Sequence, residues 1–285
     1  MRQLSTIADL RVFTRDAPRP LGLVPTMGAL HAGHMALVAA AREECASVVA
    51  TIFVNPAQFG PAEDLARYPR PLSEDLSMLE AAGVSAAFVP PVEEMFPAGS
   101  ATTVHVGAPA RPLEGEARPG HFDGVATVVA KLLLQVGPER AYFGQKDAQQ
   151  LAVVRRLVAD LDIPVSIVAV PTVREADGLA VSTRNAYLSP EQRAAAPAVY
   201  RALAAARDRF RIGAGVPAGA GTQVRAQLEA GCRERLAREP LIDAIDYVAV
   251  VDPETMAPWA GPGAAMLAVA VRMGGVRLID NVLLE

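Results

Sequence analysis

Short apolar runs alternate with amphipathic segments along the first 170 residues of the chain. The apolar runs predict buried strands, and the segments between them carry the spacing of helices that are apolar on one face. The predicted strands are Leu21–Val24, Val48–Val54, Val84–Val89, Ala141–Phe143 and Val165–Val170. Because strands that alternate with helices form a parallel sheet, we expect an α/β fold with a doubly wound sheet of the Rossmann type over residues 1–172.

The pattern changes in the last third of the chain. Ser189–Gln192 combines an N-cap serine, a proline at the first helical position and a capping-box glutamine, and it predicts a helix that runs to about Phe210. A Gly/Ala/Pro-rich loop at 212–222 precedes a second helix at 223–238. Three predicted strands follow at 245–251, 265–271 and 276–280. We therefore expect residues 173–285 to form a smaller C-terminal α+β domain.

Local patterns predict three smaller features. Thr102–Val106 has the composition of a short strand. Asp123 is a suitable N-cap for a helix over residues 124–136. Asp147 and Gln150 have the spacing of a capping box at the start of the next helix.

A charged, proline-rich segment over residues 61–71 predicts a surface loop. A helix is expected to follow over residues 73–82, opened by Glu74 and Asp75. Acids in a first helical turn complement the helix dipole, and we take this as the main role of the two residues. Magnesium binding by them is the weaker alternative.

Composition and charge narrow the possible partners. Of 285 residues, 51% are hydrophobic and 20% are charged, and the net charge of −4 supports neither nucleic-acid nor anionic-membrane binding. The apolar run near Ala264–Val271 is too short to span a bilayer, and the N-terminus lacks a secretory signal. Two cysteines cannot form a disulfide framework, so we expect a cytoplasmic protein.

The stretch Leu21–Cys45 has the organisation of an anion site. A strand leads into a turn that contains Gly28 and Gly33, with His31 and His34 three residues apart, and a helix follows. Free amide N–H groups and the helix dipole attract anions at such a helix start. From the local pattern alone, phosphate binding and a structural turn are about equally supported, and a zinc site lacks a second His/Cys pair.

Lysine is scarce in this chain. Lys131 and Lys146 are the only lysines among 27 basic residues, so arginine serves almost wherever a positive charge is needed. A retained lysine offers a compact, mobile charge that a planar guanidinium does not. Lys146 is therefore a candidate for chemistry, with chance retention as the alternative.

Several motifs together indicate a family. PTMGALHAGH at residues 25–34 carries the H-x-G-H signature of the nucleotidyltransferase superfamily. With VNPAQFG at 54–60, RPGHF at 118–122 and GQKDAQQ at 144–150, the chain resembles the pantothenate synthetase family over nearly its whole length. The resemblance implies ATP-dependent joining of pantoate to β-alanine through a pantoyl-adenylate.

The resemblance also implies site residues. His34 as proton donor, His31 and Lys146 are the catalytic candidates. Gln58 and Gln150 are the candidates for pantoate binding, with Asn55 and Arg118 as secondary candidates. The implied ATP-binding positions are Met27, Gly28, Ala29, Leu30, His31, Ala32, Gly33, His34, Gly144, Gln145, Lys146, Asp147, Val173, Val181, Ser182, Thr183 and Arg184.

Within this set, backbone N–H groups near Gly28 and Gly33 would cradle phosphates, and Ser182–Arg184 would hold the β- and γ-phosphates. Thr183 stands where the family usually has serine. Mg²⁺ would accompany ATP, with protein ligands that the sequence does not identify. The second domain would close over the ATP site, and a homodimer is implied.

Other interpretations stay open at this point. Another nucleotidyltransferase would share the H-x-G-H turn and keep the nucleotide in its product. A catalytically inactive nucleotide-binding module and a zinc-binding role for the histidines are further alternatives. Taken alone, Asn55 and Gln58 are better explained as ordinary turn residues, and Arg118 could be a residue of loop packing.

Overall fold

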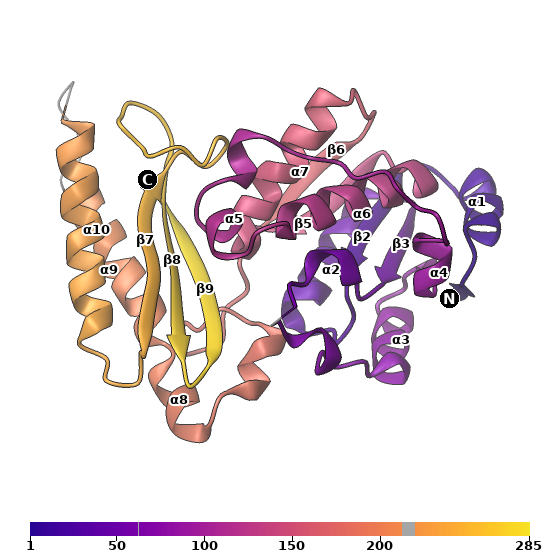
Figure 1. The fold of residues 1–285 in the computed structure, drawn as a ribbon. Coiled ribbons are helices and arrows are strands. Elements are labelled where there is room, and N and C mark those ends of the chain that lie inside the picture. Colours follow the sequence, from indigo (N-terminus) through magenta and orange to yellow (C-terminus); the bar gives the residue numbers. More distant parts are fainter. Residues whose placement is uncertain (62, 213–219) are drawn as a thin grey trace.

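A six-stranded sheet forms the larger part of the molecule (Figure 1). The computed structural model describes residues 1–61, 63–212 and 220–285. The strands are β1 Arg2–Leu4, β2 Leu21–Thr26, β3 Ser47–Ile52, β4 Ala86–Phe88, β5 Arg140–Gly144 and β6 Ser166–Val170. They are all parallel, in the order β1-β4-β3-β2-β5-β6. The predicted doubly wound fold is confirmed, and β1 is a strand that the apolar pattern did not indicate.

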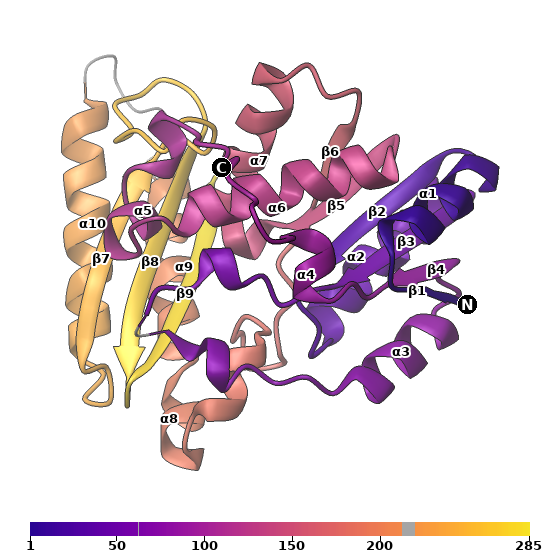
Figure 2. The ribbon, with the colours of Figure 1, turned by 45° about the vertical axis from the view of Figure 1, so that its right-hand side comes forward.

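Helices cover both faces of this sheet. They are α1 Ile7–Asp16, α2 Ala32–Glu44, α3 Leu72–Ala81, α4 Val92–Met95, α5 Glu114–Ala117, α6 His121–Val136 and α7 Ala148–Asp160. Leu23 packs in one core with α1, α6 and α7, whereas the next residue, Val24, packs in the opposite core with α2 and α3. This alternation follows from the pleat of the strand, and it places α6 and α3 on opposite sides of the strands in Figure 2.

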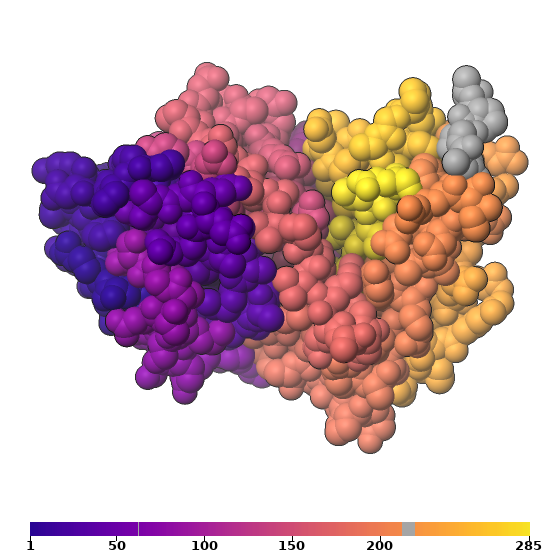
Figure 3. Space-filling model, turned by 180° about the vertical axis from the view of Figure 1, so that it is seen from behind, coloured from indigo at the N-terminus to yellow at the C-terminus, as the bar shows by residue number. Residues whose placement is uncertain are grey.

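The rest of the chain builds a second sheet. Its elements are α8 Pro190–Ala195, α9 Ala198–Ile212, α10 Gly221–Ala237, β7 Ala244–Val251, β8 Ala265–Met273 and β9 Val276–Leu284. The three strands are antiparallel, and α9 and α10 cover one face of them. The opposite face packs Met266 and Ala268 against Ala152 of α7. Figure 3 shows the N- and C-terminal parts at opposite ends of the molecule, and the predicted small antiparallel sheet is confirmed.

Two predictions around α6 are wrong. The helix begins at His121, after Gly120 with φ +81 as N-cap, so Asp123 lies inside the first turn and caps nothing. Glycine adopts this left-handed conformation without strain, which ends the preceding loop earlier than the sequence pattern suggested. Thr102–Val106 is not a strand, and one of its N–H groups donates to Thr127 Oγ1 of α6 at 2.9 Å.

The C-terminal helices also differ from the prediction. The expected helix over 190–210 is divided into α8 and α9, because Pro197 has no N–H to continue the helical ladder. The capping box of Ser189 and Gln192 is confirmed. Of the predicted loop at 212–222, residues 213–219 lie outside the described residues. Within the described ranges, no helix is both long and apolar enough to cross a membrane.

Candidate functional site

The candidate site lies where the first sheet changes its winding direction. β2 neighbours β3 on one side and β5 on the other, and the helices after β2 and β5 pack on opposite faces. Such a switch point leaves a crevice at the carboxyl ends of the strands, where ligands bind. The H-x-G-H turn follows β2 and Gly144–Asp147 follows β5, so the topology brings these two motifs together.

A cavity of about 240 Å³ occupies this crevice. It adjoins a larger cleft of about 920 Å³, and Arg118, Lys146, Ser182 and Arg184 line both. The cavity collects most of the predicted site residues: Met27, His31, Gly33, His34, Asn55, Gln58, Arg118, Gly144, Lys146, Asp147, Gln150, Val173, Val181, Ser182, Thr183 and Arg184. The predicted positions outside its lining are Gly28, Ala29, Leu30, Ala32 and Gln145.

His31 and His34 form a reciprocal cap at the start of α2. His31 Nδ1 accepts a hydrogen bond from Gly33 N–H at 3.1 Å, and His34 Nδ1 accepts one from His31 N–H at 3.3 Å. The two rings are stacked, with centroids 4.0 Å apart. Because each Nδ1 is an acceptor, the neutral rings carry their protons on Nε2. The cap therefore leaves two Nε2–H donors on residues that line the cavity.

Both imidazoles are neutral at physiological pH. Burial, followed by the nearby charge of Lys146, lowers the pKa of His31. Burial and the neighbouring His31 lower the pKa of His34 to about 3. Without nucleotide, His34 is therefore a hydrogen-bond donor and not an imidazolium, which disfavours its predicted role as an acid.

The amide groups near Gly28 are occupied by protein acceptors. Asp75 of α3 accepts hydrogen bonds from the N–H groups of Ala29 at 2.8 Å and Leu30 at 2.7 Å, and Gly28 N–H donates to Thr26 Oγ1 at 3.2 Å. A Cβ on Gly28, whose φ is +81, would lie 2.9 Å from Asp75 Oδ2. The predicted phosphate cradle of free amides is therefore wrong at this point. Asp75, which the sequence assigned to the helix dipole, instead holds the turn in place.

Lys146 is the cation that remains available at the site. It lies in η4 (Gln145–Asp147), the short 3₁₀ turn that directly follows β5. It forms no ion pair with any other described residue, whereas Arg118 and Arg184 of the same cavity are both paired. Asp147 precedes α7 without a capping bond from its side chain, so the predicted capping box with Gln150 is wrong. Both side chains line the cavity instead.

Gln58 is held at both ends of its side-chain amide. It ends η1 (Pro56–Gln58), which follows β3. Asn55 Nδ2 donates to Gln58 Oε1 at 3.0 Å and to Gly124 O at 3.1 Å, and Gln58 Nε2 donates to Met27 Sδ at 3.3 Å. A Cβ on Gly124 would lie 2.3 Å from a backbone oxygen of η1, so this close approach requires glycine. Asn55 thus orients Gln58, and both residues line the cavity.

Arg118 and His121 extend this network. Arg118 Nη1 donates to His121 Nε2 at 3.0 Å, and His121 Nδ1 donates to Gln58 O at 2.8 Å. Burial, with the charge of Arg118, lowers the pKa of His121 to about 4, as a neutral bridging ring requires. Arg118 also makes a bidentate pair with Glu63, at 2.8 and 2.6 Å. Burial raises the pKa of Glu63, but the Arg118 bonds outweigh it and hold that pKa below its usual range.

The segment after β6 is tied to the same acidic turn. Arg184 lies in η5 (Thr183–Tyr187), and its guanidinium pairs with Asp64 of η2 (Asp64–Ala66). Thr183 Oγ1 donates to Ala29 O at 3.3 Å, which links this segment to the H-x-G-H turn. Sequence reasoning missed Asp64 and Glu63 as partners of the two arginines. Two consecutive acids in a predicted surface loop were the only sequence signal.

The described residues offer no ready protein cage for magnesium. Over residues 1–61, 63–212 and 220–285, no three His, Cys, Asp or Glu side chains are grouped so that they could hold a metal ion. Asp75 already uses both carboxylate oxygens for backbone N–H groups. Mg²⁺ at phosphate sites keeps several waters and takes ligands from the substrate. A magnesium ion that accompanied a nucleotide would therefore take its ligands mainly from phosphates and water.

Comparisons with known proteins agree with these features. A family model described as pantoate-beta-alanine ligase matches residues 2–283. A pantothenate synthetase from Chloroflexus aggregans is 56% identical over 286 residues, which cover 100% of both chains. The crystal structure of pantothenate synthetase from Thermus thermophilus matches with a TM-score of 0.91 at 53% identity and covers 99% of both chains.

A more distant solved structure carries ligands in its description. It is a pantoate-beta-alanine ligase from Francisella tularensis complexed with beta-gamma ATP and beta-alanine. It matches with a TM-score of 0.77 at 30% identity, over 99% of this chain and 97% of that one.

Proposed function

Because this chain belongs to the pantoate-beta-alanine ligase family, we propose that it condenses pantoate with β-alanine at the expense of ATP. In this proposal a pantoyl-adenylate is the intermediate, and pantothenate, AMP and pyrophosphate are the products. One observation carries it: a single cavity is lined by two neutral imidazoles, Lys146 and the glutamines Gln58 and Gln150. The imidazoles and Lys146 are suitable hydrogen-bond donors for a phosphate, and the two glutamines beside them are suitable donors for a hydroxy acid.

Activation of the carboxylate is the first chemical problem. A carboxylate does not react with an amine in water, because oxide is a poor leaving group. In the proposed first step, a pantoate carboxylate oxygen attacks the α-phosphorus of ATP, and the bond from that phosphorus to pyrophosphate breaks. Catalysis of such a transfer rests on positioning and on neutralising negative charge. Magnesium on the phosphates would supply part of that neutralisation.

Lys146 is the proposed partner of the α-phosphoryl group. Its ammonium group forms no ion pair with another described residue, whereas Arg118 and Arg184 do. A phosphate can therefore reach Lys146 without first breaking an ion pair within the described ranges. His31 and His34 would donate from Nε2 to phosphate oxygens. Neutral donors bind an anion without a protonation step, which suits rings whose pKa values lie below the usual range.

Arg184 differs from Lys146 because it starts out paired with Asp64. With Ser182 and Thr183 it is the proposed holder of the β- and γ-phosphates. Its guanidinium would exchange the Asp64 carboxylate for phosphate oxygens, which have similar bidentate geometry. Nucleotide binding would thereby loosen the contact between η5 and the turn at residues 63–66.

Pantoate is proposed to bind through neutral hydrogen bonds. Gln58 and Gln150 would hold it beside Lys146, and Asn55 would keep Gln58 in orientation. In the second step the β-alanine amine attacks the acyl carbon, AMP leaves with the bonding electron pair, and the amine loses a proton. The mixed anhydride hydrolyses easily. We therefore propose that the turn at residues 63–66 and the second sheet help to exclude water from it.

Further expectations belong to the same proposal. We divide the chain into a nucleotide- and pantoate-binding domain over residues 1–172 and a domain over 173–285 that closes on the ATP site. A homodimer and a cytoplasmic location remain predictions from the family.

The proposal is tested by pyrophosphate release with Mg·ATP. We expect a small burst when pantoate alone is added, and sustained turnover with AMP formation once β-alanine is present. Lys146→Met should reduce both to a small but measurable residual rate while the protein still folds. Pyrophosphate release without any dependence on pantoate, in folded protein that binds ATP, would contradict the proposal. It would favour another nucleotidyltransferase activity, and ATP binding without pyrophosphate release would favour a binding module.

A further inference from the structure

We propose that Asn281 is a positioning residue for Lys146, and the inference rests on the proposed function because it concerns the delivery of that lysine. Asn281 belongs to β9, far from Lys146 in sequence. In Figures 1 and 2, β9 is the strand of the second sheet that lies toward the first sheet. The side chain of Asn281 crosses that junction, and only 9% of the residue is exposed.

The Asn281 side chain donates hydrogen bonds to two consecutive backbone carbonyl groups. Asn281 Nδ2 donates to Gln145 O at 3.0 Å and to Lys146 O at 2.9 Å. These two carbonyls belong to the peptide units on either side of the Lys146 Cα. Fixing both peptide planes fixes the direction in which the Lys146 side chain leaves the backbone. The side-chain amide of Asn281 thus determines the orientation of the Lys146 side chain.

The turn that carries Lys146 has little to hold it otherwise. η4 is a single 3₁₀ turn with no side-chain cap at its start, and the Asp147 side chain does not cap α7, which follows it. Short 3₁₀ segments have poorer hydrogen-bond geometry than α-helices. Both amide hydrogens of Asn281 are therefore used at a point where the local backbone is weakly restrained.

The neighbouring residue fixes Asn281 in turn. Asp280 forms a bidentate ion pair with Arg174, at 2.6 and 2.9 Å, and its Oδ1 accepts a hydrogen bond from Asn281 N–H at 2.8 Å. The Arg174 guanidinium also lies 3.9 Å from the centroid of the Tyr200 ring. Arg174 directly follows Val173 of the cavity lining. The pair Asp280–Asn281 therefore ties both the segment after β6 and the lysine turn to β9.

The test is a double-mutant cycle with pantoate-dependent ATP–pyrophosphate exchange as the readout. Asn281→Ala should slow the exchange by about 10- to 100-fold, because a small misplacement of a catalytic group costs that much. In a Lys146→Met background the same change should have almost no effect, since the lysine that it positions is absent. Asn281→Ser, which keeps a small polar group, serves if the alanine variant does not fold.

Tyr247→Phe is the matched control. Tyr247 OH donates to Glu114 Oε1 at 2.8 Å, so this change also removes a hydrogen bond between the second sheet and the first part of the chain. It does not touch Lys146, and exchange should stay within about twofold of wild type. Equal losses in Tyr247→Phe and Asn281→Ala, or full additivity with Lys146→Met, would overturn the positioning role. Wild-type protein without pantoate-dependent exchange would instead refute the proposed function.

Discussion

Asp64 holds the guanidinium of Arg184 by two hydrogen bonds, from Nε to Oδ2 at 3.0 Å and from Nη2 to Oδ1 at 2.9 Å. Burial raises the pKa of Asp64, but the bonds and charge of Arg184 outweigh it and hold that pKa below its usual range. The pair is therefore fully charged at neutral pH. A phosphate that takes the Nε and Nη2 edge of Arg184 has to displace a carboxylate.

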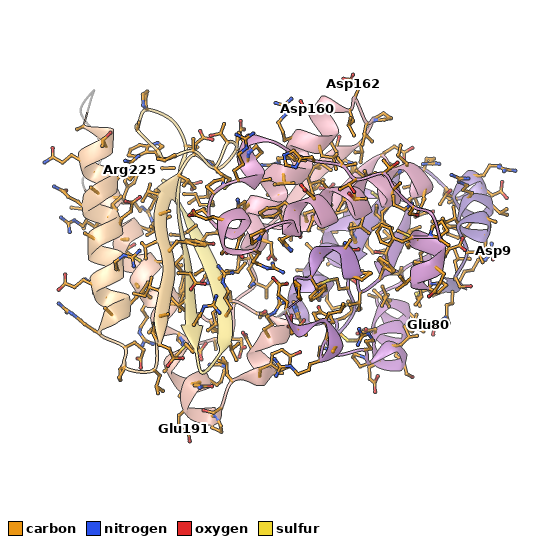
Figure 4. The ribbon with its side chains drawn as sticks, in the orientation of Figure 1. Asp9, Glu80, Asp160, Asp162, Glu191 and Arg225 are labelled. Atoms are coloured by element: carbon orange, nitrogen blue, oxygen red, sulfur yellow. The ribbon has the colours of Figure 1, made fainter. Side chains whose placement is uncertain are left out.

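Asp64→Asn is expected to lower the KM for ATP by about 3- to 10-fold, because breaking a partly exposed ion pair costs about 1 kcal/mol. Steady-state kinetics with saturating pantoate and β-alanine measures this. Asp160→Asn is the charge-matched control, since Asp160 lies at the outer end of α7, where its side chain points away from the molecule (Figure 4). A higher KM in Asp64→Asn would show that the carboxylate orients Arg184 for the nucleotide and does not compete with it.

Asp75 makes a second prediction possible. Asp75→Ala removes the acceptor of two backbone N–H groups in the H-x-G-H turn and leaves both unpaired. We expect a loss of about 2–3 kcal/mol in the free energy of unfolding, together with weaker ATP binding. Urea denaturation and ATP titration provide the two readouts. Glu74→Gln, at the exposed neighbouring position, should leave both unchanged, and equal effects of the two variants would refute the anchoring role.

The pKa of His34 predicts how stability depends on pH. The folded protein keeps this pKa at about 3, whereas an unfolded histidine titrates at about 6.5. Below pH ~6.5 the unfolded chain gains a proton that the folded protein does not, so the free energy of unfolding falls as the pH falls. For His34 alone, the loss between pH ~7.5 and ~5.0 is about 2 kcal/mol.

His34→Asn should remove the contribution of His34 to the pH dependence of the free energy of unfolding, because asparagine does not titrate. The helix cap should survive, since an asparagine oxygen can still accept the hydrogen bond from His31 N–H. Urea midpoints measured at both pH values are expected to fall less in the variant than in wild type. An identical decrease in the two proteins would place the acid sensitivity elsewhere in the molecule.

The sequence predicted the parts of the fold that have a local cause. Buried parallel strands such as β3 are continuous apolar runs, and the turns after β2 and β5 have recognisable motifs, so the switch point followed from their order. The errors came from residues whose roles depend on distant partners. Asp75 has the local pattern of a first-turn acid, yet its carboxylate bonds to Ala29 in a turn that lies 46 residues earlier.

The same limit explains what was missed at the site. Local pattern left free amides near Gly28 and a structural turn about equally supported, because it contains no information that Thr26 and Asp75 already accept hydrogen bonds from these N–H groups. Asn281 has no motif at all, and its only signal is that it follows Asp280 as a second polar residue between the apolar residues Ile279 and Val282 of β9. Charge pairing such as Asp64 with Arg184 is equally invisible, since it depends on how a loop after β3 meets a segment after β6.

Gly124 yields the last prediction, which concerns pantoate. A Cβ at this position of α6 would lie 2.3 Å from Ala57 O and 2.6 Å from Gln58 N, both backbone atoms that cannot move alone. Gly124→Ala should push η1 away from α6 and break the bond from Asn55 Nδ2 to Gly124 O. We expect the KM for pantoate to rise by about 10-fold or more through the displaced Gln58, with a smaller change in the KM for ATP.

Gly231→Ala in α10 is the matched control, because its nearest contact would be 3.8 Å away and alanine favours helix by about 1 kcal/mol. Equal increases in both KM values for Gly124→Ala would mean that the whole cavity is deformed, and Gln58 would lose its assignment as the pantoate contact.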